Sequence, residues 1–311
     1  MKILIAGCGY LGTLLGQDLA KSGHETWGLR RDILALRELE KSGLHPFHAN
    51  LLSPDSLKNL PVVDYVVMCQ APSKKNDDYR STYYEATKNF LQALTSPLKK
   101  IIFISSTSVY STQDGSWVDE ATDPIANNHG DREASENAKV LLSAEELILK
   151  SKQPSTVLRL SGIYGENRNR VKPLMEGRIQ PVFSDVYMNR IHVTDIVRAI
   201  RLLLEKGKSG EIYIGSDDSP STQKEFYSWV FEKLSIPVSE NGTPRMVTPP
   251  VHGQSNKRCS NKKIKELGMK FRYPSFKEGY LPIITEIFRA GCHAPASQVP
   301  RTNPARRSTA P

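Results

Sequence analysis

Short apolar runs alternate with amphipathic segments over the first two-thirds of the chain. The runs are nearly continuous in hydrophobic side chains, as in Ile101-Ile102-Phe103-Ile104, which is typical of parallel strands buried on both faces. They predict strands at residues 2–6, 24–29, 44–49, 62–69, 100–105 and 156–160. Apolar residues recur at helical spacing between these runs and predict helices at residues 11–22, 33–41, 77–94 and 134–150. This alternation predicts an α/β fold with a doubly wound parallel sheet.

The pattern is less regular beyond residue 162, where it predicts helices at 194–205, 222–234 and 276–289 and a strand at 211–214. We expect residues 1–160 to form a nucleotide-binding domain and residues 161–290 a smaller mixed substrate lobe at the carboxyl ends of the strands. Residues 194–214 of that lobe should pack back on the first domain. Residues 291–311 are rich in Pro, Ser, Arg and Ala and lack apolar periodicity, so we expect a disordered basic tail.

The chain has 311 residues, of which 39% are hydrophobic and 24% charged, as is usual for a globular protein. The formal net charge is +9, and three of the positive charges, Arg301, Arg306 and Arg307, lie in the tail. The other basic residues are scattered and form no stripe with aromatic residues, so we do not expect a nucleic-acid partner. A mildly basic cleft equally suits a phosphate-bearing small molecule.

The four cysteines lie far apart, without metal-ligand spacing, which suits unpaired thiols in a reducing compartment and predicts no metal; they are Cys8, Cys69, Cys259 and Cys292. The apolar run at residues 3–6 is too short for a signal peptide. No stretch approaches the roughly 20 apolar residues that a membrane span needs. We therefore expect a cytoplasmic protein with no membrane partner.

Gly7-Cys8-Gly9-Tyr10-Leu11-Gly12 matches the pattern GxGxxG between the first predicted strand and the first helix. In a dinucleotide-binding turn of the Rossmann type, Gly7 permits the tight turn, Gly9 allows close approach of a pyrophosphate, and Gly12 allows close helix–strand packing. The helix that starts at Tyr10 and Leu11 offers unpaired N–H groups to the phosphates. These residues are our candidates for cofactor binding. A glycine-rich turn without a ligand is the alternative.

Arg30 and Arg31 follow the second predicted strand, where a site that prefers NAD would place an acidic residue. An arginine there can pair with a 2′-phosphate, which an acid would repel. We therefore expect NADP to be preferred to NAD. Alternatively, both arginines are solvated residues at a helix start that Asp32 caps.

Four further segments resemble motifs of one family, in the same order along the chain. They are Ile104-Ser105-Ser106-Thr107-Ser108-Val109-Tyr110, Asp119-Glu120, Arg159-Leu160-Ser161-Gly162-Ile163-Tyr164-Gly165 and Asn189-Arg190-Ile191-His192-Val193-Thr194-Asp195-Ile196. Over roughly residues 1–285 the chain resembles the extended, epimerase/dehydratase-like branch of the short-chain dehydrogenase/reductase superfamily. The resemblance implies a Rossmann sheet, a bound NAD(P) and a site between the two lobes.

The resemblance also implies a catalytic Ser/Thr with a Tyr-x-x-x-Lys pair on one helix, in which the lysine lowers the pKa of the tyrosine. The serine position falls on Ser106, which might instead only satisfy backbone groups at a strand end. The pair falls on Asn137 and Leu141, and residues 134–150 contain no tyrosine. In this respect the chain resembles atypical members of the superfamily that have lost the pair.

Three other residues are candidates for proton transfer: Tyr83, Tyr164 and His192. Tyr83 stands where the family usually has an asparagine, and the alternative for it is packing on the sheet. For His192 the alternative is a buried, hydrogen-bonded histidine, and for Tyr164 it is substrate binding or packing in a loop. Arg168 and Arg190 are candidates for binding a polar or anionic substrate, although Arg168 also suits a solvated basic loop.

Two functions remain open from the sequence. In the first, the protein is an NAD(P)-dependent epimerase-, dehydratase- or reductase-like enzyme with a substituted acid/base group, acting on a small polar substrate such as a nucleotide sugar. In the second, it is a non-catalytic dinucleotide sensor or interaction protein, which the missing pair favours. Family resemblance also makes a homodimer one expected arrangement.

Overall fold

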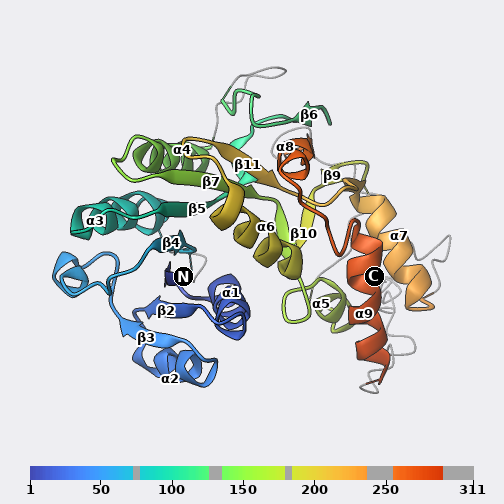
Figure 1. Ribbon diagram of the computed structural model, residues 1–311. Coiled ribbons are helices and arrows are strands. Elements are labelled where there is room, and N and C mark those ends of the chain that lie inside the picture. The colour runs from blue at the N-terminus through green and yellow to red at the C-terminus, as the bar shows by residue number, and fades with distance from the viewer. Residues whose placement is uncertain (73–77, 126–134, 179–183, 237–254, 290–311) are drawn as a thin grey trace, which may run out of the picture.

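The computed structural model describes residues 1–72, 78–125, 135–178, 184–236 and 255–289 (Figure 1). Its centre is a seven-stranded parallel sheet in the order β11-β7-β5-β4-β1-β2-β3. The strands are β1 (Lys2–Ala6), β2 (Glu25–Arg30), β3 (His45–His48), β4 (Tyr65–Met68), β5 (Lys100–Ser106), β7 (Ser155–Leu160) and β11 (Ile212–Gly215). The predicted doubly wound α/β class is confirmed.

The direction of winding reverses between β1 and β4. From β1 the chain runs outward through β2 and β3 on one side, and from β4 through β5, β7 and β11 on the other. The carboxyl ends of β1 and β4 meet at this reversal, where the Cys69 N–H donates to the Ala6 carbonyl at 2.7 Å. Open α/β sheets bind their ligands at such a switch point.

Helices cover both faces of the sheet. One buried cluster joins residues of the sheet to α1 (Tyr10–Lys21), α2 (Ile33–Lys41) and α6 (Val193–Lys206). A second cluster, on the other face, contains residues of α3 (Ala86–Ala93) and α4 (Glu136–Leu149). A π-helical turn, η2 (Arg80–Glu85), leads into α3, and two 3₁₀ turns are η1 (Pro54–Leu57) and η3 (Thr107–Val109).

A buried ion pair ties α4 to the centre of the sheet. The Arg159 Nε donates to Glu145 Oε1 at 3.0 Å and NH2 donates to Oε2 at 2.6 Å, with both side chains less than 5% exposed. Ser105 Oγ donates to the same carboxylate at 2.5 Å, and Arg159 NH1 donates to the Tyr110 hydroxyl at 2.8 Å. The network therefore fixes the carboxyl ends of β5 and β7 relative to α4.

Among the other described residues, the chain forms three small sheets and a helical cluster. The sheets pair β8 (Gly162–Tyr164) with β10 (Arg190–His192), β9 (Tyr187–Met188) with β12 (Ser221–Thr222), and β6 (Trp117–Val118) with β13 (Arg258–Cys259). Helices α5 (Val171–Met175), α7 (Gln223–Lys233) and α9 (Phe276–Arg289) share a buried cluster and lie together at the right of Figure 1. The short helix α8 (Lys262–Glu266) packs near β11.

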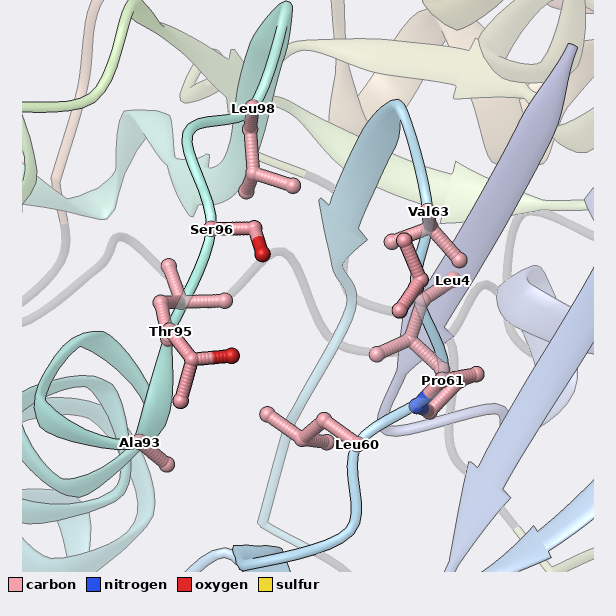
Figure 2. A pocket seen from close by; sticks show the side chains of 10 residues that line it. Leu4, Leu60, Pro61, Val63, Ala93, Thr95, Ser96 and Leu98 are labelled. Atoms are coloured by element: carbon pink, nitrogen blue, oxygen red, sulfur yellow. The ribbon is translucent and has the colours of Figure 1, made fainter.

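The predicted strand at 62–69 is four residues long, from Tyr65 to Met68. Val62 is 75% exposed, and Val63 lines a shallow crevice together with Leu4, Leu60 and Leu98 (Figure 2). The apolar residues Val62 and Val63 therefore line this crevice and do not belong to a strand. The crevice lies at the amino-terminal edge of the sheet, opposite the glycine loop.

Other differences lie at element ends and in the second half. The helix predicted at 77–94 begins as the π-helical turn η2, and residue 77 is outside the described residues. The helix predicted at 222–234 starts at Gln223 because Thr222 caps it: Thr222 Oγ1 accepts from the Glu225 N–H, and the Thr222 N–H donates to the Glu225 carboxylate. The predicted disordered tail at 291–311 also lies outside the described residues.

Candidate functional site

The glycine loop has the geometry of a phosphate cradle. Gly7 has φ +81°, and a Cβ there would lie 2.6 Å from the Gln70 backbone nitrogen, so the turn requires glycine. A Cβ at Gly12 would lie 3.0 Å from Ile5 Cγ2, which indicates tight helix–strand packing. A Cβ at Gly9 would approach nothing closer than the Gly7 carbonyl oxygen at 4.0 Å. Space therefore remains beside Gly9 for a ligand.

Helix α1 points its first amides into this space. Gly9 is the N-cap, and no side chain caps the helix. The N–H groups of the first turn, at Tyr10 and Leu11, have no partner within an α-helix. Unpaired amides, the helix dipole and the open space beside Gly9 together fit the pyrophosphate of a dinucleotide.

Arg30 lies at the carboxyl end of β2, half-buried and opposite His48 of β3. The positive charge of Arg30 acts on Cys8 of the glycine loop. Burial raises the pKa of the Cys8 thiol to about 11, and the guanidinium opposes that rise. Asp32 caps α2 through the Leu34 N–H at 3.0 Å, as the alternative for this segment expected. Arg30 therefore lies within electrostatic range of Cys8 in the glycine loop.

Ser106 ends β5 and caps η3, with its Oγ accepting from the Ser108 N–H at 3.1 Å. Tyr83 lies on η2, with its ring centroid 5.3 Å from that of Tyr79. Burial raises the pKa of Tyr83 to about 12. Both tyrosines pack against the buried cluster that contains Leu141, which the resemblance predicts at the family's lysine position. Tyr83 thus lies beside the helix that would carry the Tyr-x-x-x-Lys pair.

His192 is buried as the N-cap of α6. Its Nδ1 accepts from the Thr194 N–H at 3.2 Å, so the ring proton of the neutral form is on Nε2. Burial, together with the charge of Arg272, lowers the pKa of His192 to about 4. The ring lies 4.2 Å from that of Tyr273 and edge-on to Tyr164 at 5.1 Å. The structure thus gives His192 the capping and packing role that was its alternative, and its part in proton transfer remains a prediction.

Tyr164 and Arg190 lie in the same buried region. Tyr164 stacks on Tyr280 with centroids 4.7 Å apart. Arg190 donates to Ser221 Oγ at 2.8 Å and lies over the Phe226 ring at 4.3 Å. Only 2% of Tyr164 and 6% of Arg190 are exposed, so both have clear packing roles in the second lobe. Their substrate contacts remain predictions.

Arg168 lies apart from that region. It is exposed, in a hairpin beside Tyr10 of the glycine loop. The structure therefore brings Arg168 close to Tyr10 of the glycine loop, whereas Arg190 is buried against Ser221 and Phe226.

Sequence reasoning missed Gln70, which follows β4 beside Gly7. Its side chain is 92% buried; Nε2 donates to Thr87 Oγ1 at 3.0 Å, and Oε1 has no partner among the described residues. A polar residue directly after an apolar strand, at the switch point, was the signal that could have indicated it. Asp217, after β11, has a similarly unpartnered Oδ2, and burial raises its pKa to about 8.

Two classes of site find no support in the described part of the chain. There, no three His, Cys, Asp or Glu side chains group as metal ligands. None of the helices described there is both long and apolar enough to cross a bilayer.

Comparisons with known proteins agree with this geometry. A family model described as the NAD dependent epimerase/dehydratase family matches residues 3–215. Protein YeeZ of Escherichia coli K12 is 25% identical over 283 residues, which are 88% of this chain and 96% of YeeZ. A structure from Methylobacillus flagellatus, described as a candidate NAD-dependent epimerase/dehydratase, is 30% identical with a TM-score of 0.73, over 92% of this chain and 98% of that one. DesIV of Streptomyces venezuelae, a dTDP-glucose 4,6-dehydratase solved with NAD bound, shares the fold with a TM-score of 0.76 at 18% identity, over 93% of this chain and 97% of DesIV.

Proposed function

Because the chain belongs to the NAD-dependent epimerase/dehydratase family, and so to a family of oxidoreductase-type enzymes, we propose that it transforms a small polar substrate of the nucleotide-sugar class with a bound dinucleotide. The glycine loop carries this proposal, since the open space at Gly9 and the uncapped start of α1 fit a pyrophosphate. The substrate class is supported by DesIV, whose name specifies dTDP-glucose.

NADP is the proposed cofactor in preference to NAD. Arg30 stands at the end of β2. The next acidic residue along the chain, Asp32, caps α2. A guanidinium matches the geometry of a phosphate and adds little to the binding of a ribose hydroxyl. Arg30→Ala is expected to weaken NADPH binding about tenfold and to change NADH binding little. Equal losses for both cofactors would contradict the assignment.

Tyr83 is the proposed proton donor, with Ser106 orienting the reacting oxygen. When bound, the nicotinamide would supply or accept a hydride at the substrate carbon. With its pKa at about 12, Tyr83 carries its proton at neutral pH and can donate it but rarely accept one. The apolar Leu141 provides no charge to lower that pKa. At neutral pH we therefore expect Tyr83 to act as a donor to a substrate carbonyl oxygen.

Calorimetric titration with NADPH, NADH, NADP and NAD tests the cofactor proposal first. Binding, with preference for the 2′-phosphate forms, is the expected result; no binding of any of the four would refute it. Oxidation of NADPH with a panel of keto-sugar nucleotides then distinguishes an enzyme from a sensor. Tight cofactor binding without turnover of any panel member would favour the sensor, which the missing tyrosine of α4 supports.

A further inference from the structure

A short hairpin of the second lobe touches the glycine loop. The Gly165 N–H donates to the Arg168 carbonyl at 2.9 Å, and the Arg168 N–H donates to the Gly165 carbonyl at 3.0 Å. Asn169 steadies it from outside: its Nδ2 donates to the Glu166 carbonyl at 2.7 Å, and its Oδ1 accepts from the Val171 N–H at 3.0 Å. The position of residues 165–168 is thus fixed by several hydrogen bonds.

The hairpin rests on Tyr10, the first residue of α1. A Cβ at Gly165 would lie 2.7 Å from the Tyr10 hydroxyl and 2.8 Å from Val193 Cγ1. A glycine at 165 therefore lets the Tyr10 side chain reach the hairpin backbone. This contact joins the second lobe directly to the turn that faces the proposed pyrophosphate.

Arg168 brings a positive charge to this junction. Burial raises the pKa of the Tyr10 hydroxyl; the charge of Arg168 opposes that rise and the Glu166 carboxylate adds to it, so both side chains lie within electrostatic range of Tyr10. The Arg168 side chain is exposed, and across the described ranges it forms neither an ion pair nor a side-chain hydrogen bond. The guanidinium is therefore free of a direct ion pair there, although the Glu166 carboxylate lies in the same hairpin.

We propose that Arg168 binds the cofactor: its guanidinium pairs with the pyrophosphate of the bound dinucleotide, on the side opposite the amides of α1. The hairpin at 165–168 then holds the dinucleotide against the glycine loop and couples the second lobe to cofactor binding. A guanidinium suits this role because its fork of N–H donors matches two phosphate oxygens. The inference rests on the proposed function and moves Arg168 from the substrate to the cofactor.

Arg168→Ala tests the inference against Lys172→Ala, which removes an exposed positive charge from the neighbouring helix α5. The probes are NADPH, ADP-ribose, which retains the pyrophosphate, and adenosine, which lacks phosphate. For Arg168→Ala we expect about tenfold weaker binding of NADPH and of ADP-ribose, with adenosine unaffected. Lys172→Ala should change each affinity less than twofold, and Arg168→Lys should restore part of the loss.

The outcomes separate the two proposals. If the wild-type chain binds NADPH and Arg168→Ala binds it equally well, the inference fails and the proposed function stands. If Arg168→Ala raises only the KM of the sugar substrate, Arg168 belongs to the substrate site and the inference also fails. If the wild-type chain binds neither NADPH nor ADP-ribose, both proposals fail. Because residue 168 is exposed, its variants should keep the wild-type melting temperature, which is measured alongside.

Discussion

Glu145→Gln should destabilise the fold far more than a change at any exposed acid. The carboxylate accepts from Arg159 and Ser105 in a region where the ion-paired side chains are only 3–4% exposed. A carboxamide keeps the shape but leaves the guanidinium charge buried without a counter-charge. Breaking one partner of a buried pair costs about 3–5 kcal/mol, a large part of a typical folding free energy of about 5–15 kcal/mol.

Glu146→Gln is the matched control for this prediction. It changes the next residue of α4, whose partner Lys150 is 75% exposed, and a surface pair of this kind contributes about 0–1 kcal/mol. Urea unfolding at neutral pH, followed by circular dichroism, gives the change in the free energy of unfolding for each variant. A decrease in the free energy of unfolding of less than about 1 kcal/mol for Glu145→Gln, or of no more than for Glu146→Gln, would contradict the prediction. A double change to apolar residues at 145 and 159 should recover much of the loss, because it removes both charges together.

Three further predictions concern the site. Gly7→Ala should abolish dinucleotide binding, because its Cβ would meet Gln70 at a φ of +81°; calorimetry with NADPH tests this, and retained affinity would contradict the turn geometry. Tyr83→Phe should slow reduction about 100-fold or more while leaving the Kd of NADPH unchanged, and wild-type substrate oxidation should rise with pH toward the Tyr83 pKa of about 12. The pKa of His192 falls from 6.5 in the unfolded chain to about 4, so the unfolded state binds more protons between these values and stability is lost as pH falls through them. His192→Asn, which keeps a capping side chain, should therefore flatten the loss of unfolding free energy between about pH 6.5 and 4, and an unchanged slope would count against a buried neutral ring.

The sheet was predictable where burial is uniform. Strands β1 and β7 are buried almost throughout, and their predicted ends agree with the structure to within one residue. The pairs β8/β10 and β9/β12 are two or three residues long, so they carry no periodic signal. Each pair joins residues that are far apart in the chain, and their pairing depends on tertiary packing. A local sequence pattern does not encode this packing.

The site was predictable in its backbone part and less so in its side chains. The glycines are dictated by local geometry, so the GxGxxG pattern located the turn. His192, Tyr164 and Arg190 lie in motif-like segments, but their burial depends on Tyr273, Tyr280 and Phe226 of other segments. A motif alone does not distinguish a side chain that lines a pocket from one that packs behind it. The contact of Tyr10 with Gly165 has the same origin in tertiary packing.

Leu141, which the resemblance predicts in place of the family's lysine, and Tyr83 on η2 belong to one argument about the acid/base group. In the family that the chain resembles, a lysine on the helix lowers the pKa of a tyrosine so that it can act as a base. The resemblance places the apolar Leu141 at the lysine position, and Tyr83 packs against the same cluster from a π-helical turn, a conformation that is often found at functional sites. Leu141 brings no positive charge, and desolvation raises the pKa of Tyr83 to about 12. A protonated tyrosine can donate to a carbonyl oxygen but is a poor base for alcohol oxidation at neutral pH. If Tyr83 is the acid/base group, the pH dependence of the reaction should therefore differ from that of an enzyme with the usual pair.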